Sequence, residues 1–438
     1  MALRRRLTAS ATVATLALTF TIAAPMASPA SAAPVLGASI ALPAESYPES
    51  VAFAPDGTKA YVANAATASL SVISATNDTL GTPISLAADS SQSSVAFSPD
   101  GSKAYVTNYS DDKVSVVNVA TNTVATTISL PDALSSYSVA FSPDGSKAYV
   151  TNYQNNIVTV ISVATNTVAT YLDVPGGPIS VAFSPDGTKA YVANAFNSTV
   201  SVISVATDTV PTTISLPANS QPRSIAFTPD GSKAYVANAL NDTVSVIAVA
   251  TNSVATTVPL PARSGAYSVA VTPDGSKAFV ANSLSNTVSV ITVASDTVTS
   301  TVSLPSGSGP QSLAISPDGT KAYVANRGTS TVSVISIPSE ITSAPRQFRS
   351  PRRAATSVVL RWRAPETRNG GIITDYVVQY RAAGTTAWLT FTHTASTVRR
   401  QVVTGLTPKT SYEFKVAAKT GAGTSPYTTP VTRTTRRF

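Results

Sequence analysis

Short stretches in which apolar and polar residues alternate fill the chain from about residue 35 onward. In the stretch 157–163, for example, Val and Ile alternate mainly with Thr and Ser. A period of two residues is typical of β-strands with one buried face, and β-branched residues favour strands. Turn residues such as Pro-Asp-Gly and Ala-Thr-Asn separate the stretches. No stretch of helical period and useful length follows residue 32, so the pattern predicts an all-β protein.

The alternating stretches belong to seven copies of one sequence unit. Each copy has an Asp-Gly pair, and successive pairs are 44, 44, 42, 44, 44 and 44 residues apart, at Asp56, Asp100, Asp144, Asp186, Asp230, Asp274 and Asp318. In the third copy we expect four strands, over 138–142, 147–151, 157–163 and 167–174. Four strands per copy at this period are typical of β-propeller blades. One blade cannot bury both of its faces, so we expect seven blades to stack around an axis.

The two ends of the repeat region predict that the ring is closed by strand exchange. Residues 35–42 resemble the fourth strand of other copies, such as 123–130. The seventh copy supplies three strands over 312–337 and then breaks at Pro338. We therefore expect the N-terminal strand to complete the last blade, which leaves no free strand edge between the ends.

The repeat resembles a known family. Tyr105-Val-Thr-Asn108 and Tyr149-Val-Thr-Asn152 each follow Ser-Pro-Asp-Gly-Ser-Lys-Ala, and the remaining copies read Tyr-Val-Ala-Asn or Phe-Val-Ala-Asn. This is similar to the YVTN-repeat β-propellers, and the similarity extends over roughly residues 35–337 of the predicted propeller, residues 33–338. The resemblance implies a secreted or cell-surface protein. Members include surface-layer proteins, lactonase-like proteins and nucleic-acid binders, so the family does not fix the function.

A second domain is expected over residues 344–438, where seven short strands in about 95 residues suggest a β-sandwich. Leu406-Thr-Pro408 followed by Tyr412 resembles the tyrosine corner of a fibronectin type III domain, and Trp362 and the Asn369-Gly-Gly371 loop fit the same family. The resemblance implies a spacer or binding module, often attached to secreted carbohydrate-active enzymes. Residues 339–355 are interpreted as a basic, Pro-containing linker that merges into the first strand.

Residues 1–32 are interpreted as a secretory signal. Arg4-Arg5-Arg6 precede a mostly apolar stretch, and Ala30-Ser31-Ala32 fits a small-x-small cleavage site. A membrane anchor is the alternative, but Thr and Ser dilute the apolar stretch. We therefore expect a secreted protein that is not inserted in a membrane, and association with the cell wall is compatible with this location.

Composition narrows the chemistry. The chain has no Cys and a single His, His393. Disulfides, thiol nucleophiles and His-based metal sites are therefore excluded, as is a histidine base within the propeller. No metal and no cofactor are expected. The seven turn aspartates are interpreted as structural, with the lysine that follows each turn cancelling the charge locally.

Charge divides the chain into two parts. Residues 33–343 carry 11 Lys and Arg against 19 Asp and Glu, whereas residues 344–438 carry 16 against 3. We expect the basic domain to contact an anionic cell-wall polymer by electrostatic attraction. The alternatives are a solvated surface or docking onto the acidic propeller, and export argues against nucleic acid. The contact is assigned to Arg346, Arg349, Arg352, Arg353, Arg399, Arg400, Arg433, Arg436 and Arg437.

A ligand site is expected where the copies differ. Two positions before the common Val of the first strand the residue varies, while the next residue is Ser in all seven copies. Tyr and Arg on a rigid rim suit the recognition of a glycan or a protein; unselected loop variation is the alternative. The rim is assigned to Glu49, Tyr109, Tyr137, Tyr153, Phe196, Arg223, Tyr267, Gln311 and Arg327.

Three functions are compatible with these observations. The first is a non-catalytic binding or scaffold protein outside the cell, with a cell-wall polymer, a glycan or an extracellular protein as its partner. The second is an extracellular hydrolase acting on polysaccharide, which needs two carboxylates a few ångströms apart. No catalytic residue is assigned, because nothing in the sequence pairs two such acids. The third is a structural surface-layer subunit.

Overall fold

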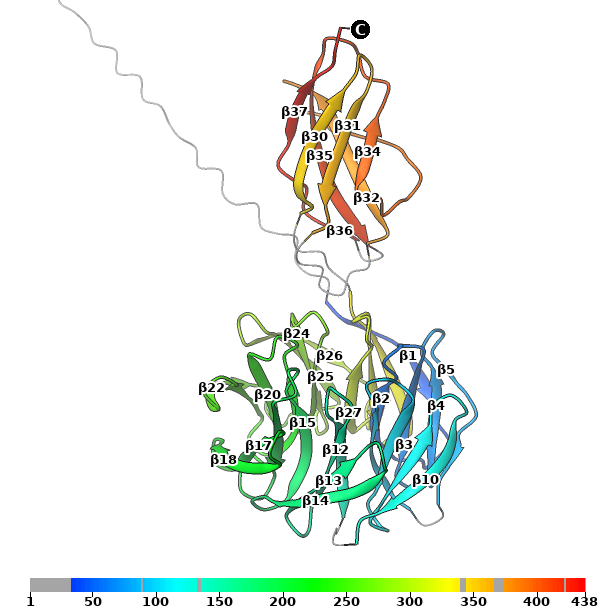
Figure 1. Cartoon of the computed structure of the whole chain (residues 1–438), viewed down its shortest axis with the longest axis vertical. Helices are drawn as coiled ribbons and strands as arrows, with labels where there is room; N and C mark the ends of the chain where they lie inside the picture. The colour runs from blue at the N-terminus through cyan, green and yellow to red at the C-terminus, as the bar shows by residue number, and fades with distance from the viewer. Residues whose placement is uncertain are drawn as a thin grey trace, which may run out of the picture. The chain divides into compact units, whose positions relative to one another are not determined.

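The computed structural model describes residues 33–87, 90–131, 135–338, 344–365, 373–420 and 423–437 (Figure 1). Every regular element of these residues is a β-strand. The predicted signal over 1–32 and the predicted loop at 369–371 lie outside the described residues. The strands up to residue 336 form seven sheets, which we call blades. They are numbered 1 to 7 in the chain order of the innermost strand of each sheet. Strands a, b, c and d of a blade run from the centre outward.

The blades share one antiparallel order, a-b-c-d. Blade 1 contains β2 (Pro48–Phe53), β3 (Lys59–Asn64), β4 (Ser69–Ser74) and an outer strand divided into β5 (Thr79–Leu80) and β6 (Ile84–Ser85). Blade 2 contains β7 (Gln92–Phe97), β8 (Lys103–Asn108), β9 (Lys113–Asn118) and β10 (Thr123–Ser129). Blade 3 contains β11 (Ser136–Phe141), β12 (Lys147–Asn152), β13 (Ile157–Ser162) and β14 (Thr167–Asp173). Blade 4 contains β15 (Pro178–Phe183), β16 (Lys189–Asn194), β17 (Thr199–Ser204) and β18 (Thr209–Ser215).

The last three blades repeat this order. Blade 5 contains β19 (Pro222–Phe227), β20 (Lys233–Asn238), β21 (Thr243–Ala248) and β22 (Ser253–Pro259). Blade 6 contains β23 (Ala266–Val271), β24 (Lys277–Asn282), β25 (Thr287–Thr292) and β26 (Thr297–Ser303). Blade 7 contains β27 (Pro310–Ile315), β28 (Lys321–Asn326), β29 (Thr331–Ser336) and, as its outer strand, β1 (Val35–Ala41).

The ring closes as the sequence predicts. β1 pairs antiparallel with β29, with Ser39 opposite Ser333 and Ile40 opposite Val332. Each strand a contacts the strand a of the next blade, and β27 of blade 7 contacts β2 of blade 1. The seven blades therefore form a closed propeller that the first strand of the chain completes.

A tight turn joins strands a and b in every blade. In blade 3, Pro143 fixes φ for the turn and Gly145 adopts a φ of +70°, which is in the left-handed region that favours glycine. The Oδ1 of Asp144 accepts hydrogen bonds from the Ser142 hydroxyl at 2.5 Å and the Ser146 amide at 3.1 Å. These bonds hold the pKa of Asp144 below its usual range. The structural interpretation of the turn aspartate therefore has a geometric basis.

The core lies between blades rather than within one sheet. One cluster joins Tyr105 and Val116 of blade 2 to Val139 and Val150 of blade 3. In five blades the tyrosine of strand b also packs against the phenylalanine of the next strand a, as Tyr105 does with Phe141 at 4.6 Å between ring centres. Because each interface buries side chains from two blades, the blades stabilise one another.

The lysine after the turn also bonds to the neighbouring blade. The Nζ of Lys147 donates to the Val205 carbonyl at 2.8 Å and to Asp208 at 2.7 Å, both in the next blade. The Tyr149 hydroxyl donates to the other oxygen of Asp208 at 2.5 Å. The lysine side chain extends across the blade interface, and in blades 1, 2 and 7 its charge also helps to lower the pKa of the turn aspartate. The same neighbour contact is made by Lys59, Lys103, Lys147, Lys189, Lys233 and Lys321.

Phe279 takes the place of this tyrosine in blade 6, and it packs against blade 7 residues such as Leu313 and Val324. The acceptor of the tyrosine hydroxyl in the other blades is an Asn or Asp in the turn between strands c and d. Blade 7 has no such turn, because its strand d is β1. An apolar residue therefore stands where a buried hydroxyl would lack this acceptor.

The C-terminal part forms a separate sandwich of two sheets. One sheet has the order β30-β31-β34 and the other the order β33-β32-β35-β36, with β37 also pairing with β35. Trp362, Tyr376 and Phe414 belong to its core. The Tyr412 hydroxyl accepts a hydrogen bond from the Thr407 amide at 3.1 Å, as a tyrosine corner does. The strands are β30 (Arg346–Arg353), β31 (Val358–Arg363), β32 (Asp375–Ala382), β33 (Leu389–Thr390), β34 (Arg400–Val403), β35 (Ser411–Thr420), β36 (Gly423–Thr424) and β37 (Val431–Thr434).

None of the described residues forms a helix long and apolar enough to cross a bilayer.

Candidate functional site

A β-bulge near the start of each strand a positions the variable side chains. The pairing register between strands a and b shifts around the second residue of strand a in all seven blades, for example between Pro222 and Ser224. A bulged residue lies outside the ladder of backbone pairs, and its side chain can be aimed away from the sheet. The variable residues of the sequence are these second residues: Glu49, Ser93, Tyr137, Ile179, Arg223, Tyr267 and Gln311.

The serine after the bulge links neighbouring blades at Ser50, Ser94, Ser224, Ser268 and Ser312. The Oγ of Ser50 accepts a hydrogen bond from the Val95 amide at 3.3 Å, and the Oγ of Ser268 accepts one from the Leu313 amide at 3.1 Å. The same type of bond joins Ser312 to Val51 across the closure of the ring. In these five blades the serine therefore has a structural role that its variable neighbour lacks.

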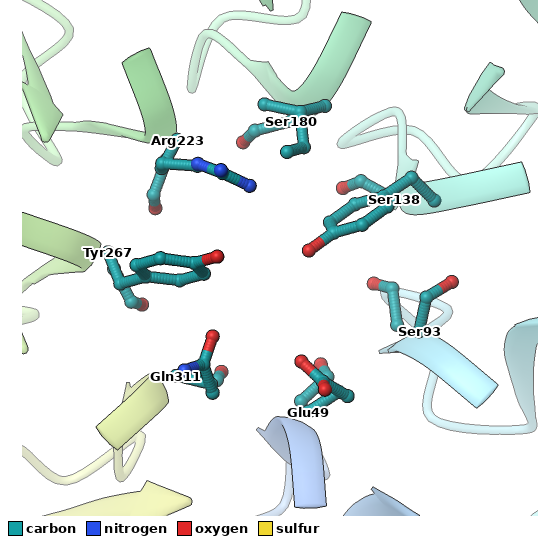
Figure 2. Close-up of a pocket in the computed structure, with 14 residues that line it drawn as sticks. Glu49, Ser93, Ser138, Ser180, Arg223, Tyr267 and Gln311 are labelled. Atoms are coloured by element: carbon teal, nitrogen blue, oxygen red, sulfur yellow. The ribbon is translucent and has the colours of Figure 1, made fainter. Parts of the chain in front are cut away.

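The bulged residues surround one cavity of about 110 Å³ at an end of the central channel (Figure 2). This volume has room for several water molecules or a small polar group. Figure 2 shows the side chains of Arg223, Tyr267, Gln311 and Glu49 pointing toward the centre of the cavity. The cavity is lined by Glu49, Ser93, Tyr137, Ile179, Arg223, Tyr267 and Gln311 together with the serine that follows each of them.

The loops between strands b and c lie beside the loops that lead into strand a. The Tyr109 amide donates to the Ser91 carbonyl at 2.7 Å, and the Arg327 amide donates to the Gly309 carbonyl at 3.3 Å. These bonds hold the loops between strands b and c and the loops that lead into strand a on the same face of the propeller. The predicted rim residues of these loops therefore lie around the cavity, behind the bulged residues. They are Tyr109, Tyr153, Phe196 and Arg327.

Three aromatic residues form a continuous cluster with Tyr137 on one side of the cavity. Tyr137 packs against Tyr109 at 6.3 Å and Tyr153 at 6.2 Å between ring centres, and Tyr153 packs against Phe196 at 4.9 Å. Phe196 is 61% exposed. Burial raises the pKa of Tyr137 well above its usual range, so its hydroxyl stays protonated and can donate a hydrogen bond.

Charged residues occupy other positions around the cavity. The Arg327 Nε donates to the Glu49 Oε1 at 2.6 Å. The Arg223 guanidinium lies over the Tyr267 ring, with its Cζ 4.7 Å from the ring centre. Burial raises the pKa of Glu49, although Arg327 and Arg223 favour its ionised form. Glu49 is the only carboxylate among the described residues that line the cavity, so these residues do not assemble the carboxylate pair of a glycosidase.

Of the nine predicted rim residues, Glu49, Tyr137, Arg223, Tyr267 and Gln311 line the cavity, and the other four lie behind it in the loops. The prediction missed two exposed apolar residues of the loops between strands b and c, Leu240 at 66% and Leu284 at 71% exposure. They occupy the same position as Phe196, two residues after the Asn that ends strand b. That alignment of the copies is the signal that could have found them.

Matches to family models agree with this architecture. Residues 343–434 match the fibronectin type III domain, and residues 205–358 match the model described as lactonase, 7-bladed beta-propeller. The chain is a seven-bladed β-propeller followed by a fibronectin type III domain. The propeller model covers only part of the blades, and the closed set of seven sheets supplies the rest of the assignment.

Solved structures with the propeller fold are similar to this chain. Hydrazine synthase of Kuenenia stuttgartiensis aligns with a TM-score of 0.62 and 22% identity, over 67% of this chain and 96% of that one. Virginiamycin B lyase from Staphylococcus aureus aligns with a TM-score of 0.59 and 14% identity, over 68% of this chain and 97% of that one. At these identities the likeness concerns the propeller fold alone.

Among curated proteins, the chain resembles receptors over a short segment. It is 36% identical to neogenin of Mus musculus over 88 residues, which are 20% of this chain and 6% of neogenin. It is 38% identical to ephrin type-B receptor 6 of Rattus norvegicus over 88 residues, which are 20% of this chain and 8% of that receptor. This chain therefore spans less than a tenth of these relatives.

Predicted contact residues of the fibronectin type III domain lie partly in its three-stranded sheet. Arg349 of β30 is opposite Arg361 of β31, and Arg361 is in turn opposite Arg400 of β34. All three side chains are exposed, and none has an acidic partner among the described residues. Arg346 and Arg352 also belong to β30, whereas Arg399 precedes β34. Arg361 and Arg363, both exposed, were not among the predicted contact residues.

The remaining predicted arginines contact the edge of this sheet or lie near it. The Arg353 side chain donates to the Thr434 carbonyl at 2.9 Å, and the Arg433 Nε donates to the Ser350 carbonyl at 3.2 Å. Arg436 and Arg437 follow β37. The structure thus places two of the predicted arginines, Arg349 and Arg400, in an exposed cross-strand row, and two others, Arg353 and Arg433, where they help to join β30 to β37.

Proposed function

We propose that this chain is a secreted or cell-surface binding protein, in which the cavity at the propeller mouth recognises a glycan and the fibronectin type III domain contacts the cell wall. A propeller joined to a fibronectin type III domain is typical of extracellular binding and scaffold proteins. The observation that supports the site is the convergence of Tyr137, Arg223, Tyr267, Gln311 and Glu49 on one cavity. Hydroxyl, amide and guanidinium groups next to aromatic rings suit a sugar, which presents hydroxyls at its edges and apolar patches on its faces.

The proposal predicts that a triple variant of the cavity loses its ligand. Tyr137→Ala, Arg223→Ala and Tyr267→Ala together remove two rings and the guanidinium from the lining. We expect the affinity for glycans and wall fragments to fall by at least about tenfold, since buried Tyr and Arg side chains commonly contribute more than 1 kcal/mol each to binding. The measurement is a glycan array followed by calorimetry on the hits.

The matched control replaces three exposed residues that do not line the cavity, with Leu80→Ala, Val124→Ala and Arg263→Ala. This variant should bind like the original protein. Equal binding by the cavity variant and the control would refute the site, provided that both unfold at the same temperature as the original.

The cross-strand row Arg349, Arg361 and Arg400 favours a second binding activity, toward an anionic wall polymer. Like charges directly opposite one another on neighbouring strands repel. Neighbouring strands lie about 4.8 Å apart, so the row presents three guanidinium groups at close spacing. A linear polyanion would relieve the repulsion and gain charge-assisted hydrogen bonds.

The row predicts salt-sensitive binding to purified wall polymer. With Arg349→Gln, Arg361→Gln and Arg400→Gln in the full chain, we expect at least a tenfold loss of binding in low salt. The control removes three exposed charges elsewhere, with Arg263→Gln, Lys409→Gln and Lys419→Gln. Raising the salt should weaken binding by the original protein, because exposed charges are screened within about 3 Å at 1 M salt. Binding that does not change with the salt concentration would contradict the role of the arginine row in polymer binding. Equal losses of binding in the two variants would contradict it as well.

A further inference from the structure

The charges around the propeller cavity do not balance one another. Arg327 forms a salt bridge with Glu49, with 2.6 Å between Nε and Oε1. Arg223 is the second cation at the cavity, and it forms no salt bridge with a carboxylate among the described residues. When Glu49 is ionised, the group of Glu49, Arg327 and Arg223 therefore carries one net positive charge.

Arg223 also has an unsatisfied hydrogen-bond donor. Its Nε is buried and has no acceptor among the described residues. The side chain comes from the bulge of β19 and lies over Tyr267, so its guanidinium is held in one orientation (Figure 2). A guanidinium offers five donors in a planar fork, and a buried donor without an acceptor is unfavourable. An oxygen anion entering the cavity would supply both the missing acceptor and the missing charge.

The other groups of the lining suit the rest of a sugar. Figure 2 shows the amide of Gln311 pointing toward the centre of the cavity near the ring of Tyr267. The amide Nε2 of Gln311 donates to the Ser283 hydroxyl at 3.1 Å, which leaves its carbonyl oxygen available to accept from a ligand hydroxyl. The exposed Phe196, next to Tyr153, offers an apolar surface for sugar units that extend out of the cavity.

We propose that the cavity binds an acidic sugar unit, whose carboxylate pairs with Arg223 and whose hydroxyls bind Gln311 and the tyrosine hydroxyls. This assignment rests on the proposed glycan site and adds the class of its ligand. The planar fork of arginine matches a carboxylate, which it can bind through two parallel hydrogen bonds. The cavity volume of about 110 Å³ admits the carboxylated end of a chain rather than a polymer threaded through it.

The test uses the full-length chain and four matched probes, measured by calorimetry. They are an oligogalacturonate, its methyl ester, a neutral oligosaccharide of the same length and a sulfated one. The original protein should bind the oligogalacturonate at least tenfold more tightly than the ester. Arg223→Gln should abolish this preference, and Glu49→Gln should strengthen binding of the acid several-fold, because it removes a negative charge from the cavity. Arg263→Gln, which changes the same charge outside the cavity, should behave like the original.

Each alternative result is decisive. Equal binding of acid, ester and neutral sugar overturns the acidic ligand but leaves the glycan site in place. Preference for the sulfated probe over the uronate overturns the carboxylate assignment. If no probe binds to the original protein or to any variant, the glycan site fails as well. Thermal unfolding of every variant confirms that a lost affinity does not reflect a lost fold.

Discussion

Replacing Ile40 by Ala is expected to lower the free energy of unfolding of the propeller by about 2–5 kcal/mol. Ile40 belongs to β1 and is 7% exposed, in a cluster that joins Tyr323 and Val332 of blade 7 to Val62 of blade 1. The substitution leaves a cavity at the boundary where the ring closes. Denaturant unfolding followed by far-ultraviolet circular dichroism measures the change.

The matched control lies on the same strand. Val35 is 61% exposed, and Val35→Ala should leave the unfolding midpoint nearly unchanged. The closure can also be tested covalently, because the chain has no cysteine of its own. Ser39→Cys with Ser333→Cys places two thiols at paired positions of β1 and β29. Oxidation should raise the unfolding midpoint and reduction should restore it. An Ile40→Ala protein as stable as the original would contradict the closing role of β1.

Replacing Asp208 by Ala is expected to destabilise the propeller by about 1–3 kcal/mol, because it removes the acceptor of two donors from the neighbouring blade. The donors are the Lys147 ammonium and the Tyr149 hydroxyl. The Tyr149 side chain is fully buried. Equilibrium unfolding in urea measures the loss.

The chain itself supplies the control for this substitution. Asn occupies the same position in three other blades, where Asn122, Asn166 and Asn252 accept from the equivalent tyrosine. Asp208→Asn keeps an acceptor for both donors and should cost less than about 1 kcal/mol. Equal losses for the Ala and Asn variants would show that the negative charge, rather than the acceptor, stabilises the interface.

Local pattern was sufficient to predict the strands. The third copy was expected to form strands over 147–151 and 157–163, and β12 and β13 occupy Lys147–Asn152 and Ile157–Ser162. Period-two alternation and turn residues are properties of neighbouring residues, so they can be recognised without knowledge of the fold. The closing strand could be predicted as well, because residues 35–42 look like the strand that the seventh copy lacks.

Partners across blade interfaces could not be predicted in the same way. Lys147 and Asp208 are 61 residues apart and meet only because one blade packs on the next. One member of the arginine row of the second domain, Arg361, was also missed. Arg361 lies opposite Arg349 and Arg400 only because of the strand register, which the sequence does not reveal. Comparison of the seven copies located the cavity residues, whereas the pairing of Arg327 with Glu49 depends on where blade 7 meets blade 1.

The bulge at the start of each strand a separates most of the side chains of the proposed binding site from the groups that join the blades. The bulged side chain takes no part in the backbone ladder, and the serine beside it carries the bond to the next blade. Positions such as Glu49, Arg223 and Gln311 can therefore accept new side chains while the frame around them stays the same, whereas Ile179 also belongs to the buried core. If the cavity binds a ligand as proposed, point substitutions at these positions would change that ligand without changing the fold, and the same positions could be randomised to select new binding proteins.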